Sequence, residues 1–352
     1  MEEKMKKTLA VVLCAVFLLT GCGAASSGSS SSDSKKLVLS TFGLSEDISE
    51  EQVYQPFEKE YNCNIVTDTG TAAERYTKLS SDSESTIDVI ELSQAMTAQG
   101  IADGLFEDID LSKIENSDDM IDVAKELAQS GNGVAYTINS MGIIYDKDAV
   151  GFEINSFNDL WNAALAGKIA IPDITTTFGP AMVYLASDYK GVDIKSDNGD
   201  AAFEALAELK PNIVKTYSKS SDLVNMFTSG EVAAAVVGDF AVPVITKSNP
   251  DLVYVTPEGT YANFNIMSIN KNSQNKDLAY QYINYRLSKD LQTTTGKALN
   301  EAPTNKTVTF TAEEAQNMTY GDVATKAKSL DYSFVNPILS NWIDQWNRIL
   351  NN

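Results

Sequence analysis

The sequence holds few side chains that could act as catalysts or metal ligands. It contains no histidine, which removes Ser-His-Asp and Cys-His catalysis and the usual zinc sites. Its cysteines are Cys14, Cys22 and Cys63. Cys63 opens a predicted strand and is expected to be a half-buried small residue rather than a nucleophile. Because no nucleotide-binding glycine motif occurs either, we expect no catalytic residue, no cofactor and no metal.

A run of threonines is the stretch best suited to contact a ligand. Thr175, Thr176 and Thr177 come shortly before Pro180, and a proline is well tolerated in the first turn of a helix, here predicted through Met182–Leu185. Hydroxyl groups and free backbone N–H groups at the start of a helix suit an anionic group. One of the three threonines is expected to be only the helix cap.

Alternating strands and helices are expected to position these residues. Repeated β-α units of this size predict an α/β fold with a mostly parallel sheet covered by helices. Strands are predicted at 36–42, 63–67, 87–92, 133–137, 142–145, 168–172, 232–237 and 264–269, and helices at 49–61, 71–79 and 276–288. Thr71, with Glu74 three residues on, is expected to cap the helix at 71–79. The apolar face Leu339, Trp342, Ile343, Trp346, Ile349 and Leu350 predicts a C-terminal packing helix within 331–352.

Ligands of open α/β sheets bind beyond the carboxyl ends of the strands, and several candidate residues follow predicted strands. Phe42 and Gly43 follow the first strand, although Phe42 could equally cap the core. Ser93 follows the third strand, where a helix N-cap is the alternative. Asp239 and Phe240 follow the strand at 232–237.

The N-terminus has the features of an export signal. Lys4, Lys6 and Lys7 precede an apolar run at 9–19 that is too short to span a bilayer. The following Leu19-Thr20-Gly21-Cys22 resembles the bacterial lipobox, which implies cleavage after residue 21 and two acyl chains on Cys22. The Ser- and Gly-rich residues 22–35 predict a flexible tether with a reach of about 20 Å. The protein is therefore expected to be extracytoplasmic and lipid-anchored.

The overall charge excludes one class of partner. The chain has 27 basic and 48 acidic residues, a net charge of −21. Without a cationic surface it is not expected to bind nucleic acid.

Four segments of the sequence resemble the spermidine/putrescine-binding family of extracellular solute-binding proteins. They occur in the family's order and spacing at Gly133–Asp148, Ser156–Asp173, Asn275–Asn284 and Ala302–Asn305, the last being similar to the family's Pro-Thr-Pro-Asn turn. The resemblance implies the two-lobed type II periplasmic-binding-protein fold, with two interlobe crossovers near 136–139 and 257–263. Lobe one would be 36–137 plus 260–330, and lobe two 138–259.

The resemblance also implies a function. Proteins of this family bind a small-molecule ligand between the lobes and deliver it to the permease and ATPase subunits of an ABC importer. It adds Asn263, Asn265 and Glu301 to the candidate ligand contacts. It implies that the aromatic ring at Phe42 stacks on the ligand and that Ser93 contacts it. The sequence departs from the polyamine pattern, because Asn265 stands for an aspartate, and Val237 and Asn263 for tryptophans.

Three hypotheses for the function remain open. The first is a polyamine or related cation held by Glu301, Asp239 and aromatic rings. The second is an anionic or zwitterionic solute held by Thr175–Thr177. The third is a membrane-anchored hydrolase or transferase, for which the sequence offers no activated nucleophile or metal cluster. Since an ammonium without a carboxylate partner costs several kcal/mol, we expect spermidine and putrescine to bind weakly and a carboxylate or phosphonate to bind better.

Overall fold

The computed structural model describes residues 35–129, 131 and 133–351. The predicted signal peptide, the candidate lipidation site Cys22 and the tether up to residue 34 lie outside the described residues. Each helix formed by the described residues is too short or too polar to span a bilayer.

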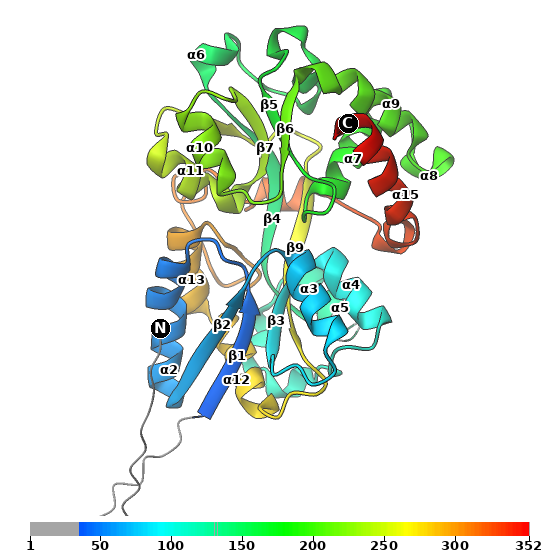
Figure 1. The fold of residues 1–352 in the computed structure, drawn as a ribbon. Helices are drawn as coiled ribbons and strands as arrows, with labels where there is room; N and C mark the ends of the chain where they lie inside the picture. The colour runs from blue at the N-terminus through cyan, green and yellow to red at the C-terminus, as the bar shows by residue number, and fades with distance from the viewer. Residues whose placement is uncertain (1–34, 130, 132, 352) are drawn as a thin grey trace, which may run out of the picture. The chain divides into compact units, whose positions relative to one another are not determined.

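The strands form a single hydrogen-bonded series, in the order β2-β1-β3-β9-β4-β7-β5-β6 (Figure 1). Three short strands lie off this path: β8 and β10 pair with β4, and β11 pairs with β9. The strands are β1 (Lys35–Thr41), β2 (Cys63–Thr69), β3 (Val89–Ser93), β4 (Val134–Tyr145), β5 (Ile169–Pro172), β6 (Ile213–Tyr217), β7 (Ala234–Gly238), β8 (Val253–Val255), β9 (Tyr261–Ile269), β10 (Ala302–Pro303) and β11 (Lys328–Ser329).

Two long strands, β4 and β9, connect the two parts of this series. β4 pairs with β9 up to Ser140, and from Met141 onward it pairs with β7. We call β1, β2, β3, β9 and the first part of β4 lobe one, and β5, β6, β7, β8 and the last part of β4 lobe two. The extended segments predicted at 133–137 and 142–145 are therefore one strand, and its change of partner lies just beyond the crossover predicted at 136–139. The predicted lobe boundaries in the sequence stay predictions.

The strand directions differ from the mostly parallel sheet that was predicted. β1 is parallel to β2 and β3, and β5 is parallel to β6 and β7. In contrast, β9 is antiparallel to β3 and β4, and β4 is antiparallel to β7. The physical reason is that β4 leads from one lobe to the other and β9 leads back, so the two strands run in opposite directions.

Both faces of the sheet are buried in each lobe. In β1, Leu37 and Leu39 pack in one apolar cluster, whereas Val38 between them packs in another. In β4, Ile143 and Ile144 are divided between two clusters in the same way. Because side chains alternate along a strand, near-continuous apolar sequences such as these require cover on both faces.

Helices supply that cover. The predicted helix at 49–61 consists of α1 (Glu46–Ser49), a π-helical turn (Glu50–Tyr54) and α2 (Gln55–Tyr61). The others are α3 (Ala72–Ser81), α4 (Gln94–Ala102), α5 (Asp122–Gln129), α6 (Lys147–Val150), α7 (Gly179–Lys190), α8 (Ile194–Asp197), α9 (Asp200–Leu209), α10 (Asp222–Thr228), α11 (Val242–Ser248), α12 (Lys276–Arg286), α13 (Lys289–Leu299), α14 (Asp322–Lys326) and α15 (Tyr332–Leu350).

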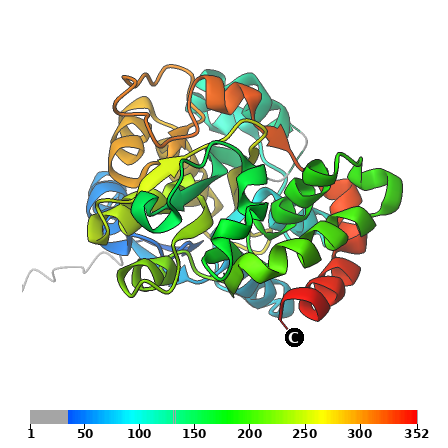
Figure 2. The same ribbon diagram turned by 90° about the horizontal axis from the view of Figure 1, so that it is seen from above.

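Two of these helices confirm detailed predictions. Thr71 caps α3 through a reciprocal pair of hydrogen bonds with Glu74, as the spacing predicts. The apolar stripe of α15 packs in the lobe two core, where Trp342 and Trp346 are buried. α15, which is red in Figure 2, contacts α9. The C-terminal segment is therefore a structural element of lobe two.

Candidate ligand-binding site

A cavity of about 640 Å³ is lined by residues of both lobes. Much of the lining comes from segments that directly follow strands: Thr41–Glu46 after β1, Thr175–Phe178 after β5 and Tyr217–Ser221 at the end of β6. This is where open α/β sheets bind ligands, and the volume is that of a small-molecule site.

Most of the predicted contact residues lie at this cavity. The lining includes Phe42, Gly43, Thr175, Thr176, Thr177, Phe240, Asn265 and Glu301. Ser93, Asp239 and Asn263 are buried and are not among the lining residues. The structure thus establishes the position of these residues, while contact with a ligand stays a prediction for each of them.

Ser93 and Asn263 lie behind the lining. Ser93 is the N-cap residue of α4, but its side chain makes no capping hydrogen bond. Asn263 accepts a hydrogen bond from the Gln94 N–H at 3.1 Å and donates one to Asn265 Oδ1 at 3.0 Å. Asn263 therefore fixes the orientation of the Asn265 amide, with its Oδ1 occupied and its Nδ2 left to donate.

Asp239 is buried and hydrogen-bonded within the protein. Its side chain is 1 % exposed, and Oδ2 accepts hydrogen bonds from both the N–H and the hydroxyl of Thr319. Burial raises the pKa of Asp239 to about 7, although the bonds from Thr319 act in the opposite direction. This carboxyl group therefore binds Thr319 inside the protein and does not line the cavity.

Phe42 lines the cavity with a guanidinium against its ring. The Arg75 Cζ atom lies 4.4 Å from the ring centroid, which is a cation–π contact. Arg75 is buried, and its Nη1 donates to the carbonyl groups of Ser40 and Glu91. Burial lowers the pKa of Arg75 to about 10, so the group stays charged at neutral pH.

A second buried guanidinium neutralises two carboxylates at the cavity. Arg286 Nη2 lies 3.1 Å from Glu301 Oε1, and Arg286 Nε lies 3.9 Å from Glu91 Oε1. Burial alone would lower the pKa of Arg286, but the neighbouring Glu301 and the other acidic groups raise it well above its usual value. The Arg286 guanidinium also lies 4.3 Å from the ring centroid of Tyr136. Glu301, predicted as a cation partner, is thus already paired.

Glu91 is saturated by hydrogen bonds as well. The hydroxyl of Thr41 donates to Glu91 at 2.6 Å, that of Tyr136 at 3.1 Å and that of Tyr282 at 3.2 Å. A ligand ammonium would have to displace these donors in order to reach the carboxylate. Unpaired buried charges cost several kcal/mol, so this network is expected to persist when a ligand binds.

The threonine run is organised by Asp173. Asp173 Oδ1 accepts hydrogen bonds from the N–H and hydroxyl of Thr175, and the Asp173 carbonyl accepts one from the hydroxyl of Thr176. The expectation that one threonine caps α7 is wrong, because the N-cap residue is Phe178 and no side chain bonds there. Pro180 does lie in the first turn, as predicted. Of the three hydroxyls, only that of Thr177 has no partner among the described residues.

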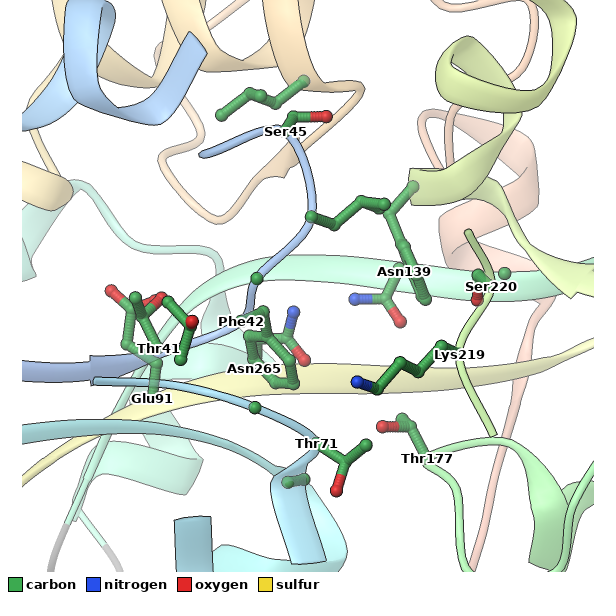
Figure 3. A pocket seen from close by; sticks show the side chains of 18 of the residues that line it. Thr41, Phe42, Ser45, Thr71, Glu91, Asn139, Thr177, Lys219, Ser220 and Asn265 are labelled. Carbon is green, nitrogen blue, oxygen red and sulfur yellow. The ribbon is translucent and has the colours of Figure 1, made fainter. Parts of the chain in front are cut away.

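Lys219 is a cavity residue that the sequence analysis missed. It follows β6, lines the cavity and points into it (Figure 3). No strand was predicted at 213–217, so the residues beyond it were not recognised as following a strand. The signal was available in Ile213–Tyr217, a short β-branched and aromatic run bounded by Pro211-Asn212 and Ser218. Thr71, Asn139 and Ser220 were missed as lining residues too.

The tryptophans pack within the protein and do not line the cavity. Trp161 is partly buried, stacks on Tyr189 and donates to the Ala205 carbonyl, while Trp342 and Trp346 are buried side chains of α15. Among the described residues, no group of three or more cysteine and acidic side chains is arranged to hold a metal ion.

Two lobes joined by crossover strands, with a small-molecule cavity lined by both, define a two-lobed solute-binding protein. Residues 52–320 match the model of the family described as bacterial extracellular solute-binding protein. This is more than half of the chain, so the protein belongs to that family. The predicted resemblance and the two-lobed α/β fold are confirmed.

Similar proteins show the class of transporter to which the chain belongs. A crystal structure of an ABC transporter from Clostridium perfringens is 53% identical, covers 90% of this chain and 100% of that chain, and has a TM-score of 0.76. The putrescine-binding periplasmic protein PotF of Escherichia coli is 26% identical over 286 residues, 74% of this chain and 77% of PotF. The protein AgtB of A. tumefaciens, solved with agropinic acid, shares the fold at 20% identity, 90% and 99% coverage and a TM-score of 0.74. The chain is therefore the extracellular solute-binding protein of an ABC transporter, as predicted.

Proposed function

We propose that the protein captures one small solute by closing its lobes around it and then presents the closed form to the permease and ATPase subunits. The observation that supports this is the cavity, whose lining comes from both lobes. Closure is favoured when the closed state makes contacts with the solute that the open state does not make. The crossover strands β4 and β9 would act as the hinge, because they are the long strands that continue from one lobe to the other.

The proposed role includes anchoring and excludes catalysis. The lipobox-like sequence ending at Cys22 supports attachment to the outer surface of the cell membrane, where the released solute would enter the importer. The acidic residues Glu91 and Glu301 are paired with Arg286 rather than poised as an acid and a base. We therefore assign no chemical step to the cavity.

The solute is proposed not to be a polyamine. Polyamine recognition requires carboxylates for the ammonium groups and open aromatic faces for the alkyl chain. Here Glu91 and Glu301 face Arg286, and Asp239 is outside the lining. The second candidate is nonetheless a polyamine, favoured by the likeness to PotF and by Glu46, a carboxylate in the lining with no partner among the described residues.

Solution scattering combined with native mass spectrometry tests the proposed capture. Protein isolated from its own membrane is expected to carry a small molecule, and removal of that molecule followed by its return should decrease the radius of gyration as the lobes close. A saturating solute that leaves the scattering curve unchanged would contradict hinge closure. Protein that carries no small molecule, and that no solute compacts, would contradict the proposed function itself.

A further inference from the structure

We propose that the solute is a small acid and that Lys219 binds its carboxylate or phosphonate head. The proposal rests on the solute-capturing function proposed above and names the class of solute. It is carried by four features of the cavity: an unpaired lysine, amide donors without acceptors, two carboxylates that Arg286 already neutralises, and two aromatic rings that already lie against guanidinium groups.

Lys219 is the unpaired cation of the cavity. It lies on the loop between β6 and α10, and its amino group forms no ion pair within the described part of the chain. Figure 3 shows its side chain extending from lobe two toward the part of the cavity that Asn265 and Thr71 line. Charge-assisted hydrogen bonds to an oxyanion are among the strong polar contacts in proteins.

Amide groups of the crossover strands add donors on the lobe one side. Asn139 and Asn265 both line the cavity, and each turns its Oδ1 toward Nδ2 of Asn263, at 3.5 and 3.0 Å. Neither Asn139 Nδ2 nor Asn265 Nδ2 has an acceptor among the described residues. From lobe two, Thr177 adds a hydroxyl group without a partner among the described residues. An oxyanion supplies the missing acceptors, whereas an ammonium would add more donors.

Two aromatic rings of the cavity, those of Phe42 and Tyr136, already lie against protein cations. Arg75 lies against Phe42 and Arg286 lies against Tyr136, with guanidinium carbons 4.4 and 4.3 Å from the ring centroids. Each ring therefore already interacts with a protein cation through its quadrupole. A second cation on the same ring would be repelled by the first.

Two further acidic residues of the lining, Glu74 and Glu46, would attract a cation rather than an anion. The Glu74 carboxylate accepts hydrogen bonds from the N–H and hydroxyl of Thr71 at 2.8 and 2.9 Å, which hold its pKa below the usual range, with a smaller contribution from Lys219. It is therefore committed to the cap of α3. Glu46 is exposed and unpaired in the lining, so a zwitterion with an ammonium near Glu46 is compatible with an acid head at Lys219.

Calorimetric titration of the full-length protein, stripped of bound solute, tests the assignment. The probes are succinate, glutamate, 2-aminoethylphosphonate and inorganic phosphate, against putrescine, spermidine and glucose. At least one acid is expected to bind. Lys219→Gln should lower the affinity for that acid by about 10- to 100-fold, the loss typical of one hydrogen bond to a charged group. Lys215→Gln, on the exposed face of β6 in the same segment, should leave the affinity unchanged. The probes that bind distinguish carboxylate from phosphonate heads.

Variants of a second residue test whether Lys219→Gln weakens acid binding only indirectly, by altering the shape of the cavity. Asn265→Asp replaces a donor by a carboxylate and should also weaken binding of the acid, more strongly for an acid of higher negative charge, while Asn265→Ser should have a smaller effect. Binding of putrescine, spermidine or glucose alone, with compaction in scattering, would overturn the acid assignment but leave the proposed function intact. Acid binding that Lys219→Gln does not weaken would overturn the role of Lys219, and binding of no probe would overturn the assignment to these acids.

Discussion

Buried charge decides which groups of the cavity remain available to a solute. Arg286 is almost inaccessible to solvent, yet it lies between two carboxylates and against Tyr136. In such a network the loss of one partner leaves another charge buried and unpaired. The carboxylates that would be the natural partners of a polyamine are thus part of the protein's internal structure, and the exposed Lys219 is left to interact with the solute.

Asp239 gives a stability prediction whose sign follows from its pKa. An unfolded aspartate titrates near pH 4, whereas burial raises the pKa of folded Asp239 to about 7. Between these values the folded state binds more protons, so this residue makes stability fall as pH rises, by up to about 1.4 kcal/mol per pH unit. Asp239→Asn keeps an oxygen that accepts from Thr319 and removes the titration. The wild type therefore loses this contribution to its free energy of unfolding as pH rises from about 5 to about 8, and the variant does not. We expect the free energy of unfolding of Asp239→Asn, minus that of the wild type, to increase over this range.

Urea unfolding at a series of pH values measures this difference. Tyr254, whose pKa the Asp239 charge helps to raise, is buried with a pKa well above its usual value, so it stays neutral over this range. Asp331→Asn is the control, because its hydrogen bonds with Lys195 and Ser333 hold the pKa of Asp331 at about 2. That carboxylate is ionised in both states above about pH 5, so its variant should differ from the wild type by a constant amount. A constant difference for Asp239→Asn as well would show that Asp239 does not titrate in this range.

Strands and helices with a strong local pattern could be predicted from the sequence, and weakly patterned ones could not. The buried run at Leu37–Leu39 and the capping box of Thr71 are encoded within a few residues, and both predictions are confirmed. β6 was missed because Val214 and Lys215 are both exposed in this edge strand, which interrupts the alternation. The continuity of β4 was missed because the prediction left residues 138–141 between its two extended segments, whereas the polar Asn139 and Ser140 are buried in an unbroken strand.

The candidate site could be predicted in outline for a related reason. Residues directly after strongly patterned strands, such as Phe42 and Thr177, were found because the ends of strands mark the site. Pairings between distant segments were not predictable, because they depend on the packing of the folded chain. Glu301 is bound by Arg286 and Asp239 by Thr319, and no spacing in the sequence encodes either contact.

The turn that leads into α7 should not tolerate a side chain at Gly179. A Cβ atom there would lie 2.2 Å from the Asp173 carbonyl oxygen and 2.4 Å from Ile174 Cα. The backbone would have to move, and with it the loop that carries Thr177. We expect Gly179→Ala to lower the free energy of unfolding by about 1–3 kcal/mol and to weaken solute binding.

Gly43→Ala is the matched control for this effect. It lies at the same cavity, but its nearest neighbour is Glu46 Oε1 at 2.9 Å, the end of a flexible and exposed side chain that can move away. Denaturant unfolding should therefore distinguish the two alanine variants. Equal stability of both would show that the turn before α7 adapts to a side chain.

The segment between Cys22 and the folded lobes bears on how a captured solute would be delivered to the importer. Lobes that close around a solute must meet a permease in the membrane, so the folded part has to stay near the bilayer and remain free to rotate. The composition of the Ser- and Gly-rich residues after Cys22 predicts a linker that meets this requirement, because Gly- and Ser-rich sequences behave as random coils. The predicted tether would keep the protein close to its importer without fixing its orientation.

Replacement of Cys22 tests the proposed anchor directly. Two acyl chains give stable membrane attachment, and the lipobox-like sequence implies that they depend on the Cys22 sulfur. We therefore expect Cys22→Ser to move the protein from the detergent phase to the aqueous phase in detergent partitioning of cell extracts. Cys63→Ser, which alters the buried cysteine of lobe one, should leave the protein in the detergent phase. If Cys22→Ser also remained there, the protein would be held at the membrane by some other part of the chain, and the proposed lipid anchor would be wrong.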